Sequence, residues 1–198
     1  MNNGWIVVFD LDDTIYMHKN KNINTNALNT LTKAVNNKGE TVSAIFLLTN
    51  NSDTEFIKSI TNYLNNKIGT RVFDFILSAE DKFKNIREQD GPTLNYSKKR
   101  VKDIEYMCNE IGISTDNLVK RILFFDDQPH VLRDEMKSNS VIGNYAWVQS
   151  ENSGDWEKGN KINSHPSLSG GRRRKGPTKH IRRIRASKKT RNRKRVCA

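Results

Sequence analysis

Three aspartates follow the first apolar run of the chain and could act together on a cation. Asp10, Asp12 and Asp13 begin directly after this run. The run, Trp5–Phe9, consists of bulky apolar residues and predicts a strand buried on both faces. Because unpaired charges are too costly to bury in such a strand, the carboxylates must lie where it ends. Side chains alternate along an extended chain, so Asp10 and Asp12 point to the same side and repel each other unless a cation or a shared proton lies between them. Mg²⁺ prefers such oxygen ligands and binds phosphates as well.

A second apolar run ends in a hydroxyl residue. Thr41–Leu48 predicts another buried strand, and Thr49 and Asn50 follow it. The Thr49 hydroxyl can hydrogen-bond a phosphoryl oxygen without changing the charge balance. Thr49 could instead begin a helix cap. However, Ser52–Glu55 already supplies a capping box for the next helix, which leaves Thr49 available for another role.

A later apolar run ends in two acidic residues. Arg121–Phe125 predicts a strand, and Asp126 and Asp127 follow it. Asp127 alone would be enough to cap the helix that Pro129 begins. The pair therefore indicates a metal site, with Asp126 as a ligand and Asp127 as a second ligand or an orienting neighbour. The carboxyl ends of parallel strands are where α/β proteins bind ligands.

These residues resemble the motifs of the haloacid dehalogenase (HAD) superfamily of phosphohydrolases. Its first motif is an apolar strand followed by D-x-D-x-T, which matches residues 10–14, and its second is a strand that ends in Thr or Ser, which matches Thr49. Its third is a lysine near a helix start, and its fourth matches Asp126-Asp127. The resemblance covers Trp5–Gln149. It implies a three-layer, Rossmann-like α/β core with a mainly parallel sheet of about five strands and no large cap domain.

The third motif has three candidates. The apolar spacing predicts a helix over Lys98–Ile111, with Ser97 as its N-cap, and Lys98, Lys99 and Lys102 lie in its first turns. Lys98 is favoured because a Ser-Lys start resembles the small capless magnesium-dependent phosphatases of the superfamily, and Lys99 is the next choice. A cluster of solvated lysines is the alternative for each of them.

The resemblance implies two-step phosphoryl transfer. Asp10 would be the nucleophile and would form an aspartyl-phosphate, while Asp12 would act as general acid and then as general base. Mg²⁺ would be held by Asp10, the backbone carbonyl of Asp12, and Asp126, with Asp127 beside them. The residues expected to hold the phosphoryl oxygens are Thr49, Asn50, Lys98 and Lys99. Asp13 has no catalytic part, and His18 is interpreted as an ordinary surface residue of the following loop.

Spacing between the motifs bears on the substrate. Thr14 and Thr41 leave room for one loop and one helix, over Asn26–Asn37. Residues 50–97 leave room for a helix, a strand over Arg71–Leu77 and a short helix. Neither interval holds a separate domain, so the site should be open. By analogy with capless relatives, an open site favours a macromolecular substrate, either a phosphoprotein or a nucleic-acid phosphate end.

Composition separates the body of the chain from its C-terminal part. The 198 residues carry a formal charge of +12. From Arg172 onward there are 14 Lys or Arg and no acidic residue, which leaves 20 basic and 22 acidic residues in the preceding part. Two cysteines, Cys108 and Cys197, do not form a disulfide framework. With no signal peptide and no membrane span in the sequence, we expect an intracellular chain.

The C-terminal part predicts a linker and a basic arm. Ser150–Gly171 is rich in Ser, Asn, Gly and Lys and is interpreted as a linker between residues 1–149 and the disordered tail of residues 172–198. Such an arm binds nucleic acid by neutralising phosphates, or acts as a nuclear localisation signal. It resembles basic tails on proteins of large DNA viruses. The tail residues expected to bind nucleic acid are Arg172, Arg173, Arg174, Lys175, Arg182, Arg183 and Arg185.

Three alternatives stand beside a phosphatase. A receiver domain also combines acids, a threonine and a lysine, but it would carry an aspartate at the end of the third strand, where this chain has Ser78. A non-catalytic HAD-fold protein could tether nucleic acid, although it need not keep Asp10, Asp12 and Asp126. A phosphotransferase or nucleic-acid end-processing enzyme could use the same site with an acceptor other than water.

Overall fold

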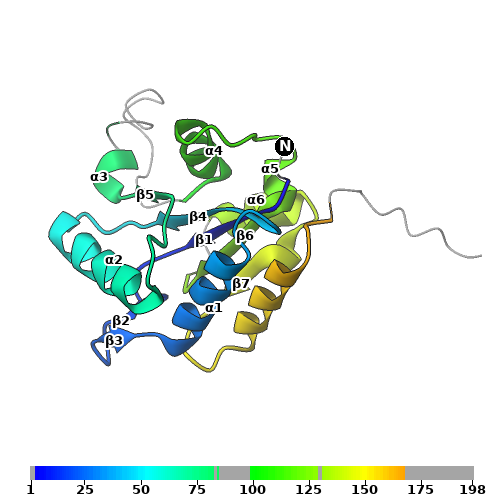
Figure 1. Ribbon diagram of the computed structural model, residues 1–198. Coiled ribbons are helices and arrows are strands. Elements are labelled where there is room, and N and C mark those ends of the chain that lie inside the picture. Colours follow the sequence, from blue (N-terminus) through cyan, green and yellow to red (C-terminus); the bar gives the residue numbers. More distant parts are fainter. Residues whose placement is uncertain (1–2, 83, 85–98, 129–130, 168–198) are drawn as a thin grey trace, which may run out of the picture. The chain divides into compact units, whose positions relative to one another are not determined.

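Five parallel strands form the central sheet of the computed structural model, which describes residues 3–82, 84, 99–128 and 131–167 (Figure 1). In chain order the strands are β1 (Trp5–Phe9), β4 (Val42–Leu48), β5 (Phe75–Leu77), β6 (Ile122–Asp126) and β7 (Tyr145–Trp147). Across the sheet they run in the order β5-β4-β1-β6-β7, and every neighbouring pair is parallel. The predicted α/β class with a parallel sheet of about five strands is confirmed.

β1 lies at the centre of the sheet, and its side chains alternate between two hydrophobic clusters. Trp5, Val7 and Phe9 belong to one cluster, and Ile6 and Val8 belong to the other. All five residues are buried. This explains why the strand is continuously apolar: a parallel strand covered on both faces has no solvent-facing side.

Helices cover both faces of the sheet, which gives three layers (Figure 1). One face is covered by α1 (Thr25–Asn36), α2 (Thr54–Ile68) and the 3₁₀ helix η3 (Gly154–Asn163). The other is covered by α4 (Val101–Glu110), α5 (Leu118–Arg121) and α6 (Val131–Ser138). The remaining elements are the hairpin strands β2 (Tyr16–Met17) and β3 (Asn22–Ile23), the short helix α3 (Ala79–Lys82) and the 3₁₀ turn η2 (Ile142–Asn144). None of the helices in the described ranges is long and apolar enough to cross a membrane.

Caps and local hydrogen bonds set several boundaries. The side chains of Asn24 and Asp53 accept hydrogen bonds from the first turns of α1 and α2, and Gly69 ends α2 in a left-handed conformation with φ 84°. β5 is shorter than the predicted strand, because the residues before it bond locally: the Arg71 guanidinium donates to the carbonyl oxygens of Phe73 and Asp74. The interval between Thr14 and Thr41 contains the β2–β3 hairpin and α1. The described part of residues 50–97 contains α2, β5 and α3, and residues 83 and 85–98 lie outside the described ranges.

The predicted linker is wrong for a large part of its length. Ser150–Gly171 includes η3, and Trp156 and Ile162 of that helix are buried in the same cluster as β1. The Trp156 ring stacks on Phe125 with ring centroids 5.5 Å apart. Trp156 and Ile162 are enough to pack this polar segment against the core, although two apolar residues give no periodic pattern in the sequence. The compact unit extends accordingly to Leu168, and the second unit, Ser169–Ala198, lies outside the described residues.

Candidate active site

The carboxyl ends of β1 and β6 bring two predicted site residues together. Phe9 pairs with Phe125 at the end of the two strands, and the Asp10 N–H donates to the carbonyl oxygen of Phe125 at 2.9 Å. Asp10 follows β1 directly, and Asp126 is the last residue of β6. Their carboxylates therefore share one edge of the sheet, as the parallel topology requires.

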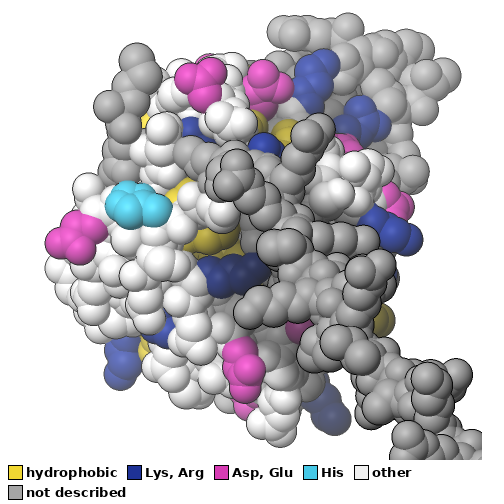
Figure 2. All heavy atoms as spheres, turned by 90° about the vertical axis from the view of Figure 1, so that its right-hand side faces the viewer, with side chains coloured by type: hydrophobic (Ala, Val, Ile, Leu, Met, Phe, Trp, Pro, Cys, Tyr) yellow, Lys and Arg dark blue, Asp and Glu magenta, His cyan; other side chains and the backbone are white. Residues whose placement is uncertain are grey.

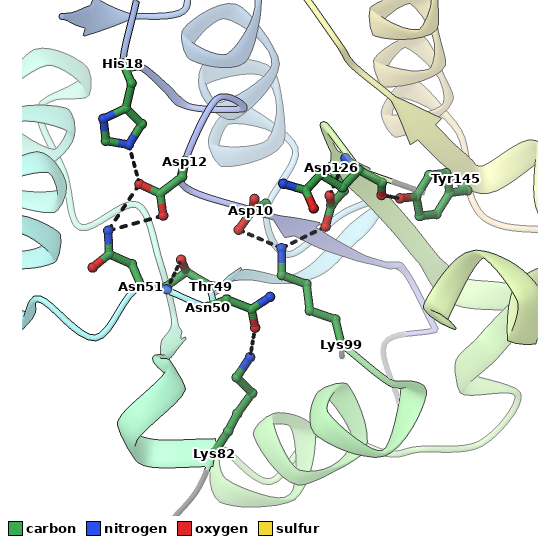
Figure 3. A network of polar contacts seen from close by, with 11 residues as sticks. Asp10, Asp12, His18, Thr49, Asn50, Asn51, Lys82, Lys99, Asp126 and Tyr145 are labelled. Carbon is green, nitrogen blue, oxygen red and sulfur yellow. Dashed lines mark hydrogen bonds and ion pairs between the residues drawn. The ribbon is translucent and has the colours of Figure 1, made fainter. Parts of the chain in front are cut away.

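Lys99 lies between these two carboxylates (Figure 3). Its Nζ is 2.7 Å from Asp10 Oδ1 and 2.8 Å from Asp126 Oδ2. All three side chains are buried, and the ammonium also lies 5.8 Å from the centre of the Phe124 ring. Lys99 lies two residues before α4, which begins at Val101, so the segment that leads into this helix places the Lys99 ammonium at the sheet edge.

Of the three lysines proposed for the third motif, Lys98, Lys99 and Lys102, one contacts the acidic residues of the site within the described ranges. Lys99 is the one that the structure brings to the acidic residues. Lys102 is exposed on α4, and Lys98 lies outside the described residues. The predicted helix start also differs, because α4 begins at Val101 and the Arg100 N–H donates to the Asp103 side chain at 2.9 Å.

Burial is the largest influence on the pKa values of the site, and the charges of Lys99 and its neighbouring carboxylates modify it. Burial raises the pKa of Asp10 to about 7; Lys99 opposes this rise and the charge of Asp126 adds to it. Burial, followed by the charge of Asp126, raises the pKa of Asp127 to about 6. Burial works to lower the pKa of Lys99, but Asp10 and Asp126 outweigh it and the net shift is upward. One ammonium thus faces more carboxylate charge than it can neutralise.

The same carboxylates form a group that fits a divalent cation. One oxygen each from Asp10, Asp126 and Asp127 lies within 4.8 Å of the other two. Asp126 Oδ1 accepts a hydrogen bond from the Gln128 N–H at 2.8 Å, and the Trp147 indole of β7 donates to the Asp127 carbonyl at 2.8 Å. An oxygen-only donor set with surplus negative charge suits Mg²⁺, so these residues fit the predicted ion.

Asp12 is held apart from this group by two donors (Figure 3). His18 Nε2 lies 2.6 Å from Asp12 Oδ1. Asn51 Nδ2 lies 3.1 Å from Asp12 Oδ1 and 3.2 Å from Oδ2. The expectation that His18 is an ordinary surface residue is therefore wrong about its contacts, although its side chain is 52% exposed. The Asp12 side chain is not among the carboxylates that could hold the cation.

The residues after β4 organise the other side of the site. Thr49 is buried, and its Oγ1 accepts a hydrogen bond from the Asn51 N–H at 3.0 Å. Asn50 Oδ1 accepts a hydrogen bond from Lys82 Nζ, which α3 places below it (Figure 3). Lys82 is fully buried and was not singled out from the sequence.

A polar cleft of about 190 Å³ connects these groups. Its lining residues are Asp10, Asp12, Asp13, Asn50, Asn51, Lys99, Asp126, Asp127 and Gln128. Thr49 is not among these residues, although its hydroxyl accepts the hydrogen bond from the Asn51 N–H. A small cleft walled by carboxylates, amides and one ammonium can hold a metal ion and a phosphoryl group better than an apolar ligand.

The remaining predicted site residues belong to the tail, and the comparisons with known proteins identify no family for the chain. Arg172, Arg173, Arg174, Lys175, Arg182, Arg183 and Arg185 all lie outside the described residues. No family model matches the chain, and no curated protein or solved structure matches it.

Proposed function

We propose that the chain is a Mg²⁺-dependent phosphomonoester hydrolase that acts through an aspartyl-phosphate on Asp10. The observation that supports this most is the Lys99 ammonium between the Asp10 and Asp126 carboxylates at the carboxyl ends of β1 and β6. A phosphoryl group that replaces part of this contact would meet a nucleophile, a fixed cation and a metal site in one place.

Asp10 and Asp12 would carry the chemistry of both steps. In the first, a carboxylate oxygen of Asp10 bonds to phosphorus while the bond to the leaving oxygen breaks, and Asp12 donates a proton to that oxygen. In the second, water attacks phosphorus, Asp12 takes the proton of the water, and the bond to Asp10 breaks to release phosphate. The separation of Asp12 from the Asp10–Lys99–Asp126 cluster supports this division of roles.

The other residues would neutralise and orient. Lys99 and the Asn50 amide would bind phosphoryl oxygens, and the Thr49 hydroxyl would hold the loop after β4 through its hydrogen bond from the Asn51 N–H. Asp10, Asp126 and Asp127 would hold Mg²⁺. When bound, this ion would supply positive charge to the nucleophile and the phosphate.

The order of these residues along the chain also supports membership of the HAD superfamily, in its capless form. Asp10, Thr49, Lys99 and Asp126 occur in the sequence of the four motifs. Between Asp13 and β4 the structure places only the short β2–β3 hairpin, α1 and connecting turns. That arrangement favours a macromolecular substrate over a small enclosed metabolite, as we propose.

Turnover of p-nitrophenyl phosphate tests the proposal. The full chain should release p-nitrophenolate with Mg²⁺, and Asp10→Asn should lower the rate by at least about a hundredfold, because the amide is a poor nucleophile. Asp134→Asn, at an exposed position of α6, is the matched control and should behave as wild type. The proposal would be overturned if the wild-type protein does not turn over p-nitrophenyl phosphate, or if Asp10→Asn turns it over at the wild-type rate.

A nucleic-acid arm at residues 172–198 is the second part of the proposed function. On the face seen in Figure 2, described Lys and Arg side chains are interspersed with Asp and Glu, whereas the sequence concentrates 14 basic residues beyond Gly171. Such a run favours polyanions through counterion release, and it is also the basis for predicting nuclear import. Removing residues 172–198 should abolish salt-sensitive oligonucleotide binding while p-nitrophenyl phosphate turnover is retained. Binding that survives the truncation would show that the arm is not the contact.

A further inference from the structure

We propose that His18 is a positioning residue that aims the Asp12 carboxyl group at the leaving oxygen. This inference rests on the proposed function and adds a residue to it. His18 Nε2 lies 2.6 Å from Asp12 Oδ1, within hydrogen-bond distance. In the tautomer that carries its proton on Nε2, the imidazole donates to Asp12 Oδ1 and restricts the rotation of the carboxyl group.

His18 is itself held in place by one backbone hydrogen bond and two ring contacts. The His18 backbone N–H donates to Asp13 Oδ1 at 3.1 Å. The Tyr16 ring meets the imidazole edge-to-face with centroids 5.2 Å apart, and the Phe56 ring of α2 stacks on it at 6.0 Å. Tyr16 and Phe56 also contact each other, with centroids 5.1 Å apart. A histidine that only fills a surface turn needs no such set of supports, whereas a histidine that must present Nε2 in one direction does.

Asn51 holds the same carboxylate from the opposite element. Its Nδ2 reaches both oxygens of Asp12, its Oδ1 accepts the Asp53 N–H at 2.8 Å, and its own N–H donates to Thr49. Among the residues that the structure describes, the Asp12 side chain makes its polar contacts with His18 and Asn51. The hairpin after β1 and the loop after β4 thus hold the carboxyl group as a pair.

This arrangement has a defined chemical consequence. A proton from Asp12 is needed most when the leaving oxygen is a strong base, and least when it is a stable anion such as p-nitrophenolate. His18 takes no part in the proton transfers themselves: Asp12 gives one proton to the leaving oxygen in the first step and takes one from water in the second. Loss of the His18 donor should therefore slow substrates with poor leaving groups selectively.

Two substitutions separate positioning from packing. His18→Phe keeps an aromatic ring against Tyr16 and Phe56 but has no donor, whereas His18→Gln keeps a side-chain N–H of similar reach but has no ring. With Mg²⁺, His18→Phe should lower kcat/KM for phenyl phosphate by about tenfold or more, and that for p-nitrophenyl phosphate by less than about threefold. His18→Gln should stay within about threefold of wild type on both substrates.

Controls make each outcome informative. His165→Phe changes the other histidine in the described ranges, an exposed residue, and should leave both rates unchanged. His18→Ala, a second variant without a donor, should repeat the selective loss if the phenylalanine variant folds poorly. In an Asp12→Asn background, His18→Phe should cause no further loss for phenyl phosphate.

The opposite results would overturn the inference. If His18→Phe matches wild type while His18→Gln is impaired, the residue only packs. Equal losses on both substrates in His18→Phe and His18→Ala would exclude a role at the leaving oxygen. Either result leaves wild-type turnover and the Asp10→Asn loss intact, and failure of the proposed function would instead remove wild-type turnover itself.

Discussion

Lys99 Nζ and Asp10 Oδ1 are 2.7 Å apart at a buried edge of the sheet, although they come from distant parts of the sequence. Each charge makes the burial of the other tolerable. The Lys99 side chain is 2% exposed and the Asp10 side chain 8%, so neither can turn to solvent if its partner is removed. The pair therefore links stability to the proposed chemistry, and a single substitution should disturb both.

Lys99→Met should cost activity and stability together. Removing the ammonium leaves the carboxylates of Asp10 and Asp126 without it, so turnover of p-nitrophenyl phosphate should fall by about a hundredfold or more. Without Mg²⁺ at pH 8, the free energy of unfolding should fall by about 3–5 kcal/mol, measured by urea denaturation. The loss should be smaller at pH 5, where Asp10 already carries a proton. Lys102→Met, at an exposed position of α4, is the matched control. Equal stability losses in the two variants would contradict the buried role of Lys99.

Stability of the metal-free protein should fall as the pH rises. The pKa of Asp10 is raised to about 7, above the ordinary carboxyl value of the unfolded chain. Between pH 4 and 7 the folded state therefore holds a proton that the unfolded state has lost. This stabilisation is complete below pH 4 and disappears as the pH passes 7. In EDTA, the free energy of unfolding should decrease over this interval, by on the order of 2–4 kcal/mol more in wild type than in Asp10→Asn. Parallel pH profiles of the two proteins would show that Asp10 titrates as in the unfolded chain.

Mg²⁺ should reverse this effect of pH. A cation at Asp10, Asp126 and Asp127 favours the ionised carboxylates, so saturating Mg²⁺ should raise the Tm by about 5 °C or more at pH 8. The increase should be smaller at pH 5, because the raised pKa values of Asp10 and Asp127 make protons compete with the ion. Asp126→Asn should abolish the Tm increase, and Asp134→Asn should preserve it. A Tm increase of the same size in Asp126→Asn would place the ion elsewhere.

Much of the candidate site could be predicted from local sequence and one rule of topology. An apolar run that ends in acids predicts a strand end, and parallel pairing then places the ends of neighbouring strands together. That reasoning correctly joins Asp10 to Asp126 across β1 and β6. It could not select among neighbouring lysines, because a shift of one residue at a helix start changes which side chain reaches the sheet.

The residues that sequence reasoning missed depend on loops. His18 reaches Asp12 because Tyr16 and Met17 pair back on Asn22 and Ile23, and no apolar periodicity marks so short a hairpin. Asn51 reaches Asp12 across the sheet edge, which is a tertiary contact without a sequence signal. Hydrogen bonds between loops of different strands thus decide the surroundings of the proposed general acid.

η3 is the clearest case in which composition misleads, and it gives the last prediction. Trp156 is 8% exposed, stacks on Phe125 beneath the site, and donates from its indole to the Ser150 carbonyl oxygen at 3.2 Å. Trp156→Ala should lower the free energy of unfolding by about 3–5 kcal/mol, because it leaves a cavity beside β6.

A chain that ends at Gln149 should lose cooperative thermal unfolding, whereas one that ends at Ser167 should retain it and bind Mg²⁺ as the full chain does. Trp147→Phe serves as the comparison, because Trp147 lies outside the cluster that contains Trp156. It removes the hydrogen bond from the indole to the Asp127 carbonyl oxygen, so it should weaken Mg²⁺ binding but lower the free energy of unfolding less than Trp156→Ala does. If the chain that ends at Gln149 unfolds like the full protein, η3 contributes nothing to the fold and the segment is a linker after all.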